Sequence, residues 1–161
     1  MCLLSEAHVS LPMDELKELL GDLEKRSLFD NHHEKSKILA TFPMNTQIAH
    51  TVLKKIMVVG PRDLVTVQKS RQISRNSSVL ASASFSLEEE VIPAPAEGVT
   101  RAELILGGCI IRQVEKRSCL LTILGELDFK IAQFLQKNVA LKAGNYAQMV
   151  SEYVSLVQKE E

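Results

Sequence analysis

The sequence EGVTRAELILGGCIIRQVEKRSCLLTILGEL, residues 97–127, contains three apolar runs separated by turn residues. Residues 98–106 have the composition of a strand. Gly107-Gly108 has that of a two-residue hairpin turn, because glycine adopts positive φ without strain. Residues 109–112 are then the returning strand, and Lys116-Arg117-Ser118 is a second turn before an apolar strand over residues 119–127. We therefore expect three consecutive antiparallel strands in this region.

An amphipathic segment follows these strands. Asp128 is placed to cap a helix, and apolar residues recur from Ile131 to Val157, mostly at steps of three, four and seven. Glycine in a helix interior costs about 1 kcal/mol, so we expect a kink or brief break at Gly144-Asn145. The predicted fold class is α+β: a curved antiparallel sheet packed on a long C-terminal α-helix.

The rest of the chain supplies further strands and one helix. A length of 161 residues with 45% hydrophobic residues predicts a single domain over residues 1–161. Glu88-Glu89-Glu90 is expected in a solvated loop and Pro93-Ala94-Pro95-Ala96 in a stiff exposed one. We expect strands over residues 2–9, 36–42, 46–59, 64–69 and 79–85, a polar turn over 71–77, and an amphipathic helix over 12–25.

Composition excludes several classes of function. Lys and Arg number 19 against 20 Asp and Glu, a balance that gives no basis for a nucleic-acid partner. No apolar run is long enough to cross a bilayer, and the first residues do not form a signal peptide. Cys2, Cys109 and Cys119 lack Cys-x-x-Cys spacing, which predicts reduced thiols and not disulfides or zinc ligands. We expect a cytoplasmic protein without metal or cofactor.

Catalytic patterns are equally sparse, so we expect a protein that is not an enzyme. No Gly-x-Ser-x-Gly nucleophile motif occurs, and apolar neighbours should raise the pKa of the Cys109 and Cys119 thiols. The pair His32-His33 precedes Glu34, but adjacent side chains point apart, so a solvated turn is preferred to a metal site.

Other charged and polar residues have structural interpretations. His50, on an apolar strand, is expected to be a hydrogen-bonded structural residue. Arg62 and Asp63 are expected to form a structural ion pair, and Arg101 with Glu103 another, because residues two apart share a strand face.

Four short motifs occur in a characteristic order. They are Leu28-Phe29-Asp30, Gly60-Pro61-Arg62-Asp63-Leu64-Val65, Val99-Thr100-Arg101-Ala102-Glu103 and Leu127-Asp128-Phe129-Lys130. They resemble, respectively, the Trp-Asp turn, the Pro-Arg-Asp signature, the Val-Arg-Ala-Glu strand and the start of the lid helix in the START family, the lipid-transfer domains related to the steroidogenic acute regulatory protein. The resemblance extends over residues 10–140.

This resemblance implies a helix-grip fold with an apolar tunnel under a C-terminal lid helix, and it implies lipid binding and intermembrane lipid transfer. The implied partners are a phospholipid, sterol or fatty acyl ligand and a transient membrane surface. Gly144 or the Ala96-Glu97-Gly98 loop is the expected hinge for exchange. The expected lipid-binding residues are the polar Thr51, Thr66 and Gln68 for the head, Leu53, Leu104, Ile111, Leu121 and Ile123 on the sheet, and Ile131, Phe134, Leu135 and Val139 on the lid.

The chain also departs from the family pattern. The family has a helix and further strands before the segment that corresponds to residues 2–9, so we expect an N-terminally truncated domain. In the sterol-carrying branch an acidic residue and an arginine lie inside the tunnel, and these positions fall near Thr51 and Gln68. Two uncharged residues there weaken a sterol assignment, although they could hydrogen-bond a headgroup, ester or hydroxyl.

Two alternatives to a lipid carrier remain open. One is a non-binding regulatory or interaction remnant of a START domain, and the other is an accessory lipid-sensing domain of an acyl-CoA thioesterase. An apolar stripe at helical spacing is usually core, and sequence does not distinguish a filled core from a hollow one. A closed cavity of about 300 to 1,000 Å³, the usual size of ligand pockets, would favour the carrier over the remnant.

Overall fold

A computed structural model of the chain describes residues 1–84 and 92–160. Over these residues an eight-stranded sheet has the order β1-β8-β7-β5-β4-β3-β2, with antiparallel neighbours, and β6 pairs in parallel with β4. The elements are β1 (Cys2–Val9), α1 (Met13–Gly21), α2 (Arg26–Phe29), β2 (His33–Phe42), β3 (Thr46–Leu53), β4 (Arg62–Ser74), β5 (Ser77–Ser84), β6 (Thr100–Arg101), β7 (Glu103–Glu115), β8 (Ser118–Asp128), α3 (Gln133–Ala143) and α4 (Tyr146–Glu160). The predicted loop at Glu88–Glu90 lies outside the described residues.

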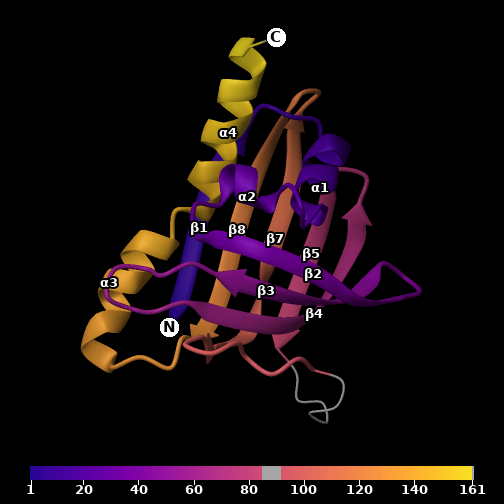
Figure 1. Cartoon of the computed structure of the whole chain (residues 1–161). Helices are drawn as coiled ribbons and strands as arrows, with labels where there is room; N and C mark the ends of the chain where they lie inside the picture. Colours follow the sequence, from indigo (N-terminus) through magenta and orange to yellow (C-terminus); the bar gives the residue numbers. More distant parts are fainter. Residues whose placement is uncertain (85–91, 161) are drawn as a thin grey trace.

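Helices cover one face of the curved sheet. Figure 1 shows α1, α2 and α4 gathered over the part of the sheet near the β7–β8 turn, with α3 lower, beside β1. The α+β class and the sheet packed on a C-terminal helix are as the sequence predicted. The sheet is more extensive than the three strands of residues 97–127.

The first core cluster holds α1, α2 and α4 against β1, β7 and β8. In α4 the buried residues Ala147, Val150 and Val154 lie at steps of three and four, so they share one face of the helix. Leu16 of α1 and Leu121 of β8 are fully buried in the same cluster. This is the grip between sheet and helix.

A second cluster lies around α3 and the start of β4. Leu53, Leu64 and Phe129 form it together with Val139 of α3. Ile131 and Leu135 pack against it while remaining partly exposed. The space between the two clusters is where the cavity described below is found.

Gly107-Gly108 is not the predicted hairpin turn. Strand β7 continues through both residues, and each glycine pairs with β5 on one side and with β8 on the other. Backbone pairing on both sides keeps the chain extended, which overrides the local turn preference of the glycines. The turn occurs at Lys116-Arg117, as predicted.

The C-terminal segment also differs in detail from expectation. The helix begins at Gln133 and not at Asp128, whose side chain accepts a hydrogen bond from Lys130 N at 2.8 Å in a turn where Lys130 has φ 53°. A break separates α3 from α4 at Gly144-Asn145, as predicted. The single long helix is therefore two helices that pack on different clusters.

Three further boundaries are corrected. The expected helix over residues 12–25 ends at Gly21, and the Arg26–Phe29 turn of helix follows. β3 ends at Leu53, because residues 56–59 form a tight turn closed by an Ile56–Val59 bridge. β4 continues to Ser74, so the predicted polar turn is shorter than residues 71–77.

Candidate functional site

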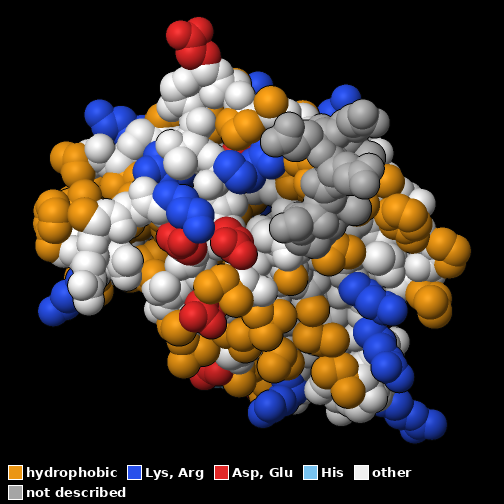
Figure 2. All heavy atoms as spheres, turned by 90° about the horizontal axis from the view of Figure 1, so that it is seen from below, with side chains coloured by type: hydrophobic (Ala, Val, Ile, Leu, Met, Phe, Trp, Pro, Cys, Tyr) orange, Lys and Arg blue, Asp and Glu red, His pale blue; other side chains and the backbone are white. Residues whose placement is uncertain are grey.

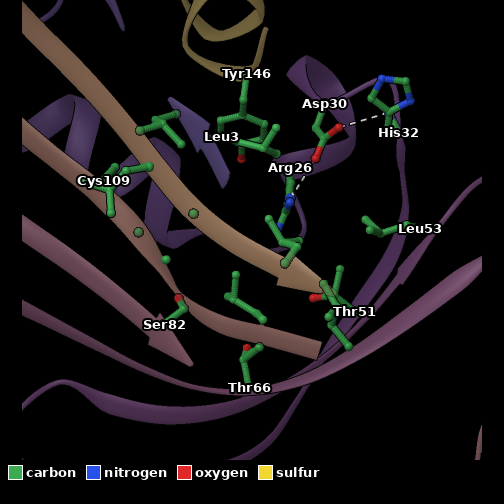
Figure 3. A pocket seen from close by; sticks show the side chains of 18 of the residues that line it. Leu3, Arg26, Asp30, His32, Thr51, Leu53, Thr66, Ser82, Cys109 and Tyr146 are labelled. Carbon is green, nitrogen blue, oxygen red and sulfur yellow. Dashed lines mark hydrogen bonds and ion pairs between the residues drawn. The ribbon is translucent and has the colours of Figure 1, made fainter. Parts of the chain in front are cut away.

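A cavity of about 220 Å³ lies between the curved sheet and the helices. Strands β1, β3, β4, β5, β7 and β8 contribute its walls, α2 borders it, and Gly144 and Tyr146 reach it from the junction of α3 and α4. Figure 3 shows these elements surrounding the space, with Thr51, Thr66 and Ser82 on the sheet and Arg26, Asp30 and Tyr146 opposite. The molecule is hollow here, although the volume is below the 300 to 1,000 Å³ usual for ligand pockets.

Most of the cavity wall is aliphatic or bare backbone. Leu64, Leu104 and Ile123 face it from three strands because alternate residues of a strand point to the same side. Gly107 and Gly125, paired across β7 and β8, line it without any side chain. The glycines that sequence analysis assigned to a turn therefore form a flat section of the wall.

A row of polar side chains crosses the sheet side of the cavity. Thr51, Thr66, Gln68 and Ser82 come from β3, β4 and β5. The Gln68 side-chain amide donates to Thr66 Oγ1 at 3.3 Å, and its Oε1 accepts from the Gln47 amide at 3.1 Å. These groups are uncharged hydrogen-bonding partners for a polar part of a ligand.

An ion pair closes the opposite side. Arg26 Nε donates to Asp30 Oδ2 at 3.0 Å, and Asp30 Oδ1 accepts from the backbone N–H of His32 at 2.9 Å. The Arg26 guanidinium lies 5.4 Å from the centroid of the Tyr146 ring, within the range of a cation–π contact. Burial opposes the charge on Arg26, but Tyr146 and Asp30 outweigh this and keep its pKa above the usual value. Burial raises the pKa of Tyr146 to about 12, so its hydroxyl stays neutral.

The structure brings half of the sequence-predicted binding residues to this cavity. Those that line it are Thr51, Leu53, Thr66, Gln68, Leu104 and Ile123. The family resemblance therefore placed these six residues correctly on the cavity side of the sheet. That they bind a lipid stays a prediction.

The other predicted residues lie elsewhere. Ile111 and Leu121, 2% and 0% exposed, pack in the first core cluster because the helices cover that end of the sheet. On α3, Val139 is buried in the second cluster and Leu135 packs beside it, as does Ile131 just before the helix, whereas Phe134 is 78% exposed. The lid face thus contacts core residues, and none of these four is among the residues that line the cavity.

Sequence reasoning missed the ion pair and the glycine wall. Arg26 and Asp30 are four residues apart in Arg-Ser-Leu-Phe-Asp, a spacing that places two side chains on one helix face. That spacing was the available signal. The sequence contains no comparable signal for Tyr146, because the apolar residues around it recur at the same helical spacing as core residues do.

The predicted ion pairs have other partners. Asp63 accepts from Arg101 Nε at 2.8 Å and lies 2.9 Å from His50 Nε2, so His50 is a hydrogen-bonded structural residue as expected. Arg62 instead donates to Phe129 O at 2.8 Å, and Glu103 pairs with Lys130. Burial works against the charged carboxylate, but hydrogen bonds from Arg101 and His50 prevail and hold the pKa of Asp63 below its usual value.

His33 is not in a solvated turn. It is 2% exposed, because β2 begins at this residue and places the ring inside the molecule. The three cysteines are free, and burial raises the pKa of the Cys109 thiol to about 11. Over residues 1–84 and 92–160, no group of three His, Cys, Asp or Glu residues is arranged to hold a metal ion. Within the same residues, no helix has both the length and the apolar character needed to cross a membrane.

Comparison with known proteins gives consistent matches. The acetyl-coenzyme A thioesterases of Mus musculus and Rattus norvegicus are 24% and 22% identical over 147 residues, which are 91% of this chain and 26% of each thioesterase. The chain thus spans about a quarter of the length of the curated relatives it matches.

Solved structures share the fold at low sequence identity. Human StAR-related lipid transfer protein 5 has a TM-score of 0.82 at 15% identity, covering 97% of this chain and 75% of that one. The lipid transfer and protein localization domain of human StarD13 has a TM-score of 0.77 at 20% identity, covering 92% and 74%. These neighbours confirm the helix-grip fold. The family model of the START domain matches residues 3–154, and with nearly the whole chain matched, the chain belongs to the START domain family.

Proposed function

We propose that the chain binds a lipid in the cavity between its sheet and its helices and carries it between membranes. The observation that carries this proposal is the hollow of about 220 Å³ with aliphatic walls and a polar row. Membership of the START family, and the likeness to proteins described as lipid transfer domains, support it. The proposed carrier breaks no covalent bond and needs no catalytic residue.

The proposed driving force is removal of an apolar chain from water. Each buried methylene contributes about 0.8 kcal/mol, so a chain of several methylenes provides useful affinity. The small volume favours a ligand with one chain, such as a fatty acyl compound, over a two-chain phospholipid. Thr51 and Gln68 are uncharged, and they lie near the positions where the sterol-carrying branch has an acidic residue and an arginine. This difference weighs against a sterol as the ligand.

Polar groups of the cavity would hold the head of the ligand. Thr51, Thr66 and Gln68 offer neutral hydrogen bonds from the sheet, and the Arg26–Asp30 pair offers a charged neighbour opposite. Arg26 belongs to the cavity wall, and its side chain is 27% exposed. A ligand that extends from the sheet to α2 would contact both sets.

Exchange of the ligand requires an opening, and α3 is our candidate for the lid. Among the α3 side chains that the structure describes, Val139 alone is fully buried. The His32 Nε2–H donates to Lys142 O at 3.2 Å, which links the end of α3 to the segment before β2. Gly144, at the break before α4, would serve as the hinge, with the Ala96-Glu97-Gly98 loop as the second candidate.

An apolar patch, formed by Met57 and Val58 in the turn after β3 and by Phe134 and Leu141 on α3, is our candidate for membrane contact. Val58 is 73% exposed and Leu141 65% exposed. The basic residues Lys54, Lys55, Lys137 and Lys142 are exposed on the same two segments. Figure 2, which views the molecule from below, shows hydrophobic side chains gathered on this end, with both basic and acidic side chains among them. Apolar side chains flanked by lysine suit transient binding to an anionic membrane, in the cytoplasm that we propose as the setting.

The test combines native mass spectrometry of the purified protein with uptake of a fluorescent fatty acid from vesicles. We expect a bound lipid and measurable uptake by the wild type. Thr66→Phe fills the cavity and should abolish both, whereas Thr41→Phe on the exposed face of β2 should leave both intact. A folded wild-type protein that carries no lipid and takes none up would instead support the interaction remnant.

A second candidate function is favoured by the match to acetyl-coenzyme A thioesterases. In this alternative the domain senses a lipid beside a catalytic domain in a longer product. Full-length sequencing of the transcripts would test this alternative, because it requires that the same open reading frame also encode a thioesterase domain.

A further inference from the structure

A buried histidine is connected to the cavity by two hydroxyl groups. His33 Nε2 lies 2.8 Å from Ser36 Oγ, and Ser36 Oγ lies 2.9 Å from Thr51 Oγ1. Ser36 and Thr51 are directly opposite each other on β2 and β3, so both point to the same face of the sheet. Thr51 lines the cavity (Figure 3), whereas His33 and Ser36 are not among the residues that line it. The chain of contacts leads from the interior to the proposed ligand.

The other ring nitrogen of His33 fixes the direction of this chain. Among the residues that the structure describes, none is a hydrogen-bond partner of His33 Nδ1, which is buried. A buried N–H without an acceptor is rarer in proteins than an acceptor with an unused lone pair. The proton of a neutral ring therefore belongs on Nε2, from which it is donated to Ser36.

The ring is also neutral. Burial lowers the pKa of His33, and the nearby Arg26 and Lys54 act in the same direction, while Asp30 and Glu34 oppose them. A doubly protonated ring would bury a charge as well as an unpaired N–H, which is the more costly arrangement.

We propose that His33 is a positioning residue that makes Thr51 a hydrogen-bond donor to the cavity, so that the ligand group beside Thr51 is an acceptor such as the carbonyl oxygen of a ketone, ester or carboxylate. With Nε2–H donating to Ser36, Thr51 Oγ1 is the one acceptor left for the Ser36 hydrogen among the described residues. Ser36 therefore donates to Thr51, and the Thr51 hydrogen is left to point at the ligand. The opposite tautomer would reverse every bond and present only lone pairs, which suit a ligand hydroxyl. This assignment rests on the proposed lipid-binding function and names its ligand class.

The first arm of the test needs no lipid. Nitrogen-15 NMR of the imidazole side chains distinguishes the two tautomers by their chemical shifts. We expect His33 with a bare Nδ1 and a protonated Nε2 in the wild type. A protonated Nδ1, in either the other tautomer or the imidazolium, overturns the proposed direction of the hydrogen bonds from His33 through Ser36 to Thr51.

The second arm compares a long-chain methyl ketone with the secondary alcohol of the same carbon skeleton, by displacement of a fluorescent fatty acid. The wild type should prefer the ketone by roughly fivefold, because the alcohol oxygen can accept the same hydrogen bond only if its own O–H is left unpaired beside Thr51. Thr51→Val should lose this preference and Thr51→Ser should keep it. Ser36→Ala should reduce the ratio of ketone to alcohol affinity, because the Thr51 hydroxyl is then free to rotate. An equal affinity for both compounds in the wild type, or a preference that survives in Thr51→Val, overturns the proposal.

A matched control and the two arms together separate the possible failures. Ser78→Ala removes another buried strand hydroxyl, which donates to Arg71 O and is not part of the cavity wall, and should leave the ratio unchanged. Thermal unfolding of each variant checks the fold, and Thr51→Ser remains informative if Thr51→Val is unstable. Ketone binding with the wrong tautomer refutes this inference and leaves the carrier standing. The expected tautomer with no binding of either compound, while the fluorescent fatty acid still binds, refutes the ligand class alone. If the fatty acid does not bind either, the carrier and the ligand class are refuted together.

Discussion

At the scale of single residues, the cavity wall depends on close approach between backbones. Gly108 has φ 150°, and a Cβ added there would overlap the carbonyl oxygen of Leu80 on β5. A Cβ at Gly107 would meet the Leu104 side chain at 2.9 Å and Leu124 O at 3.3 Å, a tight but less severe contact. Glycine is needed at Gly108 because any side chain there would push β5 away from β7.

We predict that Gly108→Ala destabilises the fold by about 3 kcal/mol, the cost of severe overpacking in a sheet. Gly21→Ala is the matched control, because a Cβ at the end of α1 meets nothing within 4 Å. That change should be neutral or stabilising by up to about 1 kcal/mol. Urea unfolding of both variants measures the difference, and equal stabilities would refute the packing argument.

A second prediction concerns Asp63, which is 1% exposed and held by Arg101 and His50. Asp63→Asn should lower the free energy of unfolding by about 3 kcal/mol, the low end for a broken buried ion pair, because the Arg101 side chain is 30% exposed. Glu126→Gln, which neutralises an exposed carboxylate on β8, is the control and should have little effect.

The direction in which the stabilisation by Asp63 changes with pH follows from the pKa of its carboxyl group. The folded-state pKa of Asp63 lies below the usual 3.8, so its stabilisation is fully present above that pH and is lost as the pH falls through the folded-state value. Urea midpoints from neutral pH to below 3.8 should therefore fall less steeply in Asp63→Asn than in the wild type. If the urea midpoints of the two proteins fall equally steeply at acid pH, another titrating group is responsible for the loss of stability.

At the scale of elements, the two C-terminal helices differ in how they are held. Buried Ala147, Val150 and Val154 fasten α4 to the first core cluster, whereas Val139 is the one fully buried residue described on α3. The N-cap residue of α3, Ala132, makes no side-chain cap hydrogen bond. A helix with little burial and no cap opens more readily than its neighbour.

We predict that His32→Ala loosens α3. The substitution removes the hydrogen bond to Lys142 O, and loss of about 1 kcal/mol should increase the opening of α3 roughly fivefold. Hydrogen exchange followed by mass spectrometry should show faster exchange in α3 and no change in α4. His8→Ala, on the exposed face of β1, is the control. Unchanged exchange in α3 would exclude His32 as a restraint on the lid.

Helices and strands were predictable from the sequence where their apolar residues recur at a regular spacing. The apolar steps after residue 128 indicated helix and Gly144 indicated the break, but the helix start was wrong, because Asp128 bonds the N–H of Lys130 in a turn instead of capping. β4 continues through residues 71–74, of which all but Ile73 are polar, since pairing with β5 compensates for the weak strand preference of the polar residues. Pairing partners distant in sequence decide such boundaries.

At the scale of the whole molecule, the sequence predicted the architecture better than the site. The order of motifs indicated the family and the fold, and the resemblance to that family indicated Thr51, Leu53, Thr66 and Gln68 as residues of the cavity wall. It did not reveal where along the sheet the helices end and the cavity begins, so Ile111 was assigned to the cavity and lies in the core. Filled and hollow interiors need the same apolar residues. Only the placement of α1, α2 and α4 in space separates them.

The last prediction follows from treating the ligand as part of the folded state. A compound that binds the folded chain alone stabilises it by about 2.7 kcal/mol at a hundred times its dissociation constant. For a chain of this size that free energy corresponds to a rise of roughly 5 to 10 °C in the unfolding midpoint. We expect this rise when the wild type is mixed with a long-chain methyl ketone, and a smaller one as the chain is shortened, because each methylene left out removes about 0.8 kcal/mol. Thr66→Phe should abolish the rise and Thr41→Phe should retain it, since only the first residue lines the cavity. A midpoint independent of chain length would mean that the alkyl chain is not buried, and the hollow would then have no role in binding.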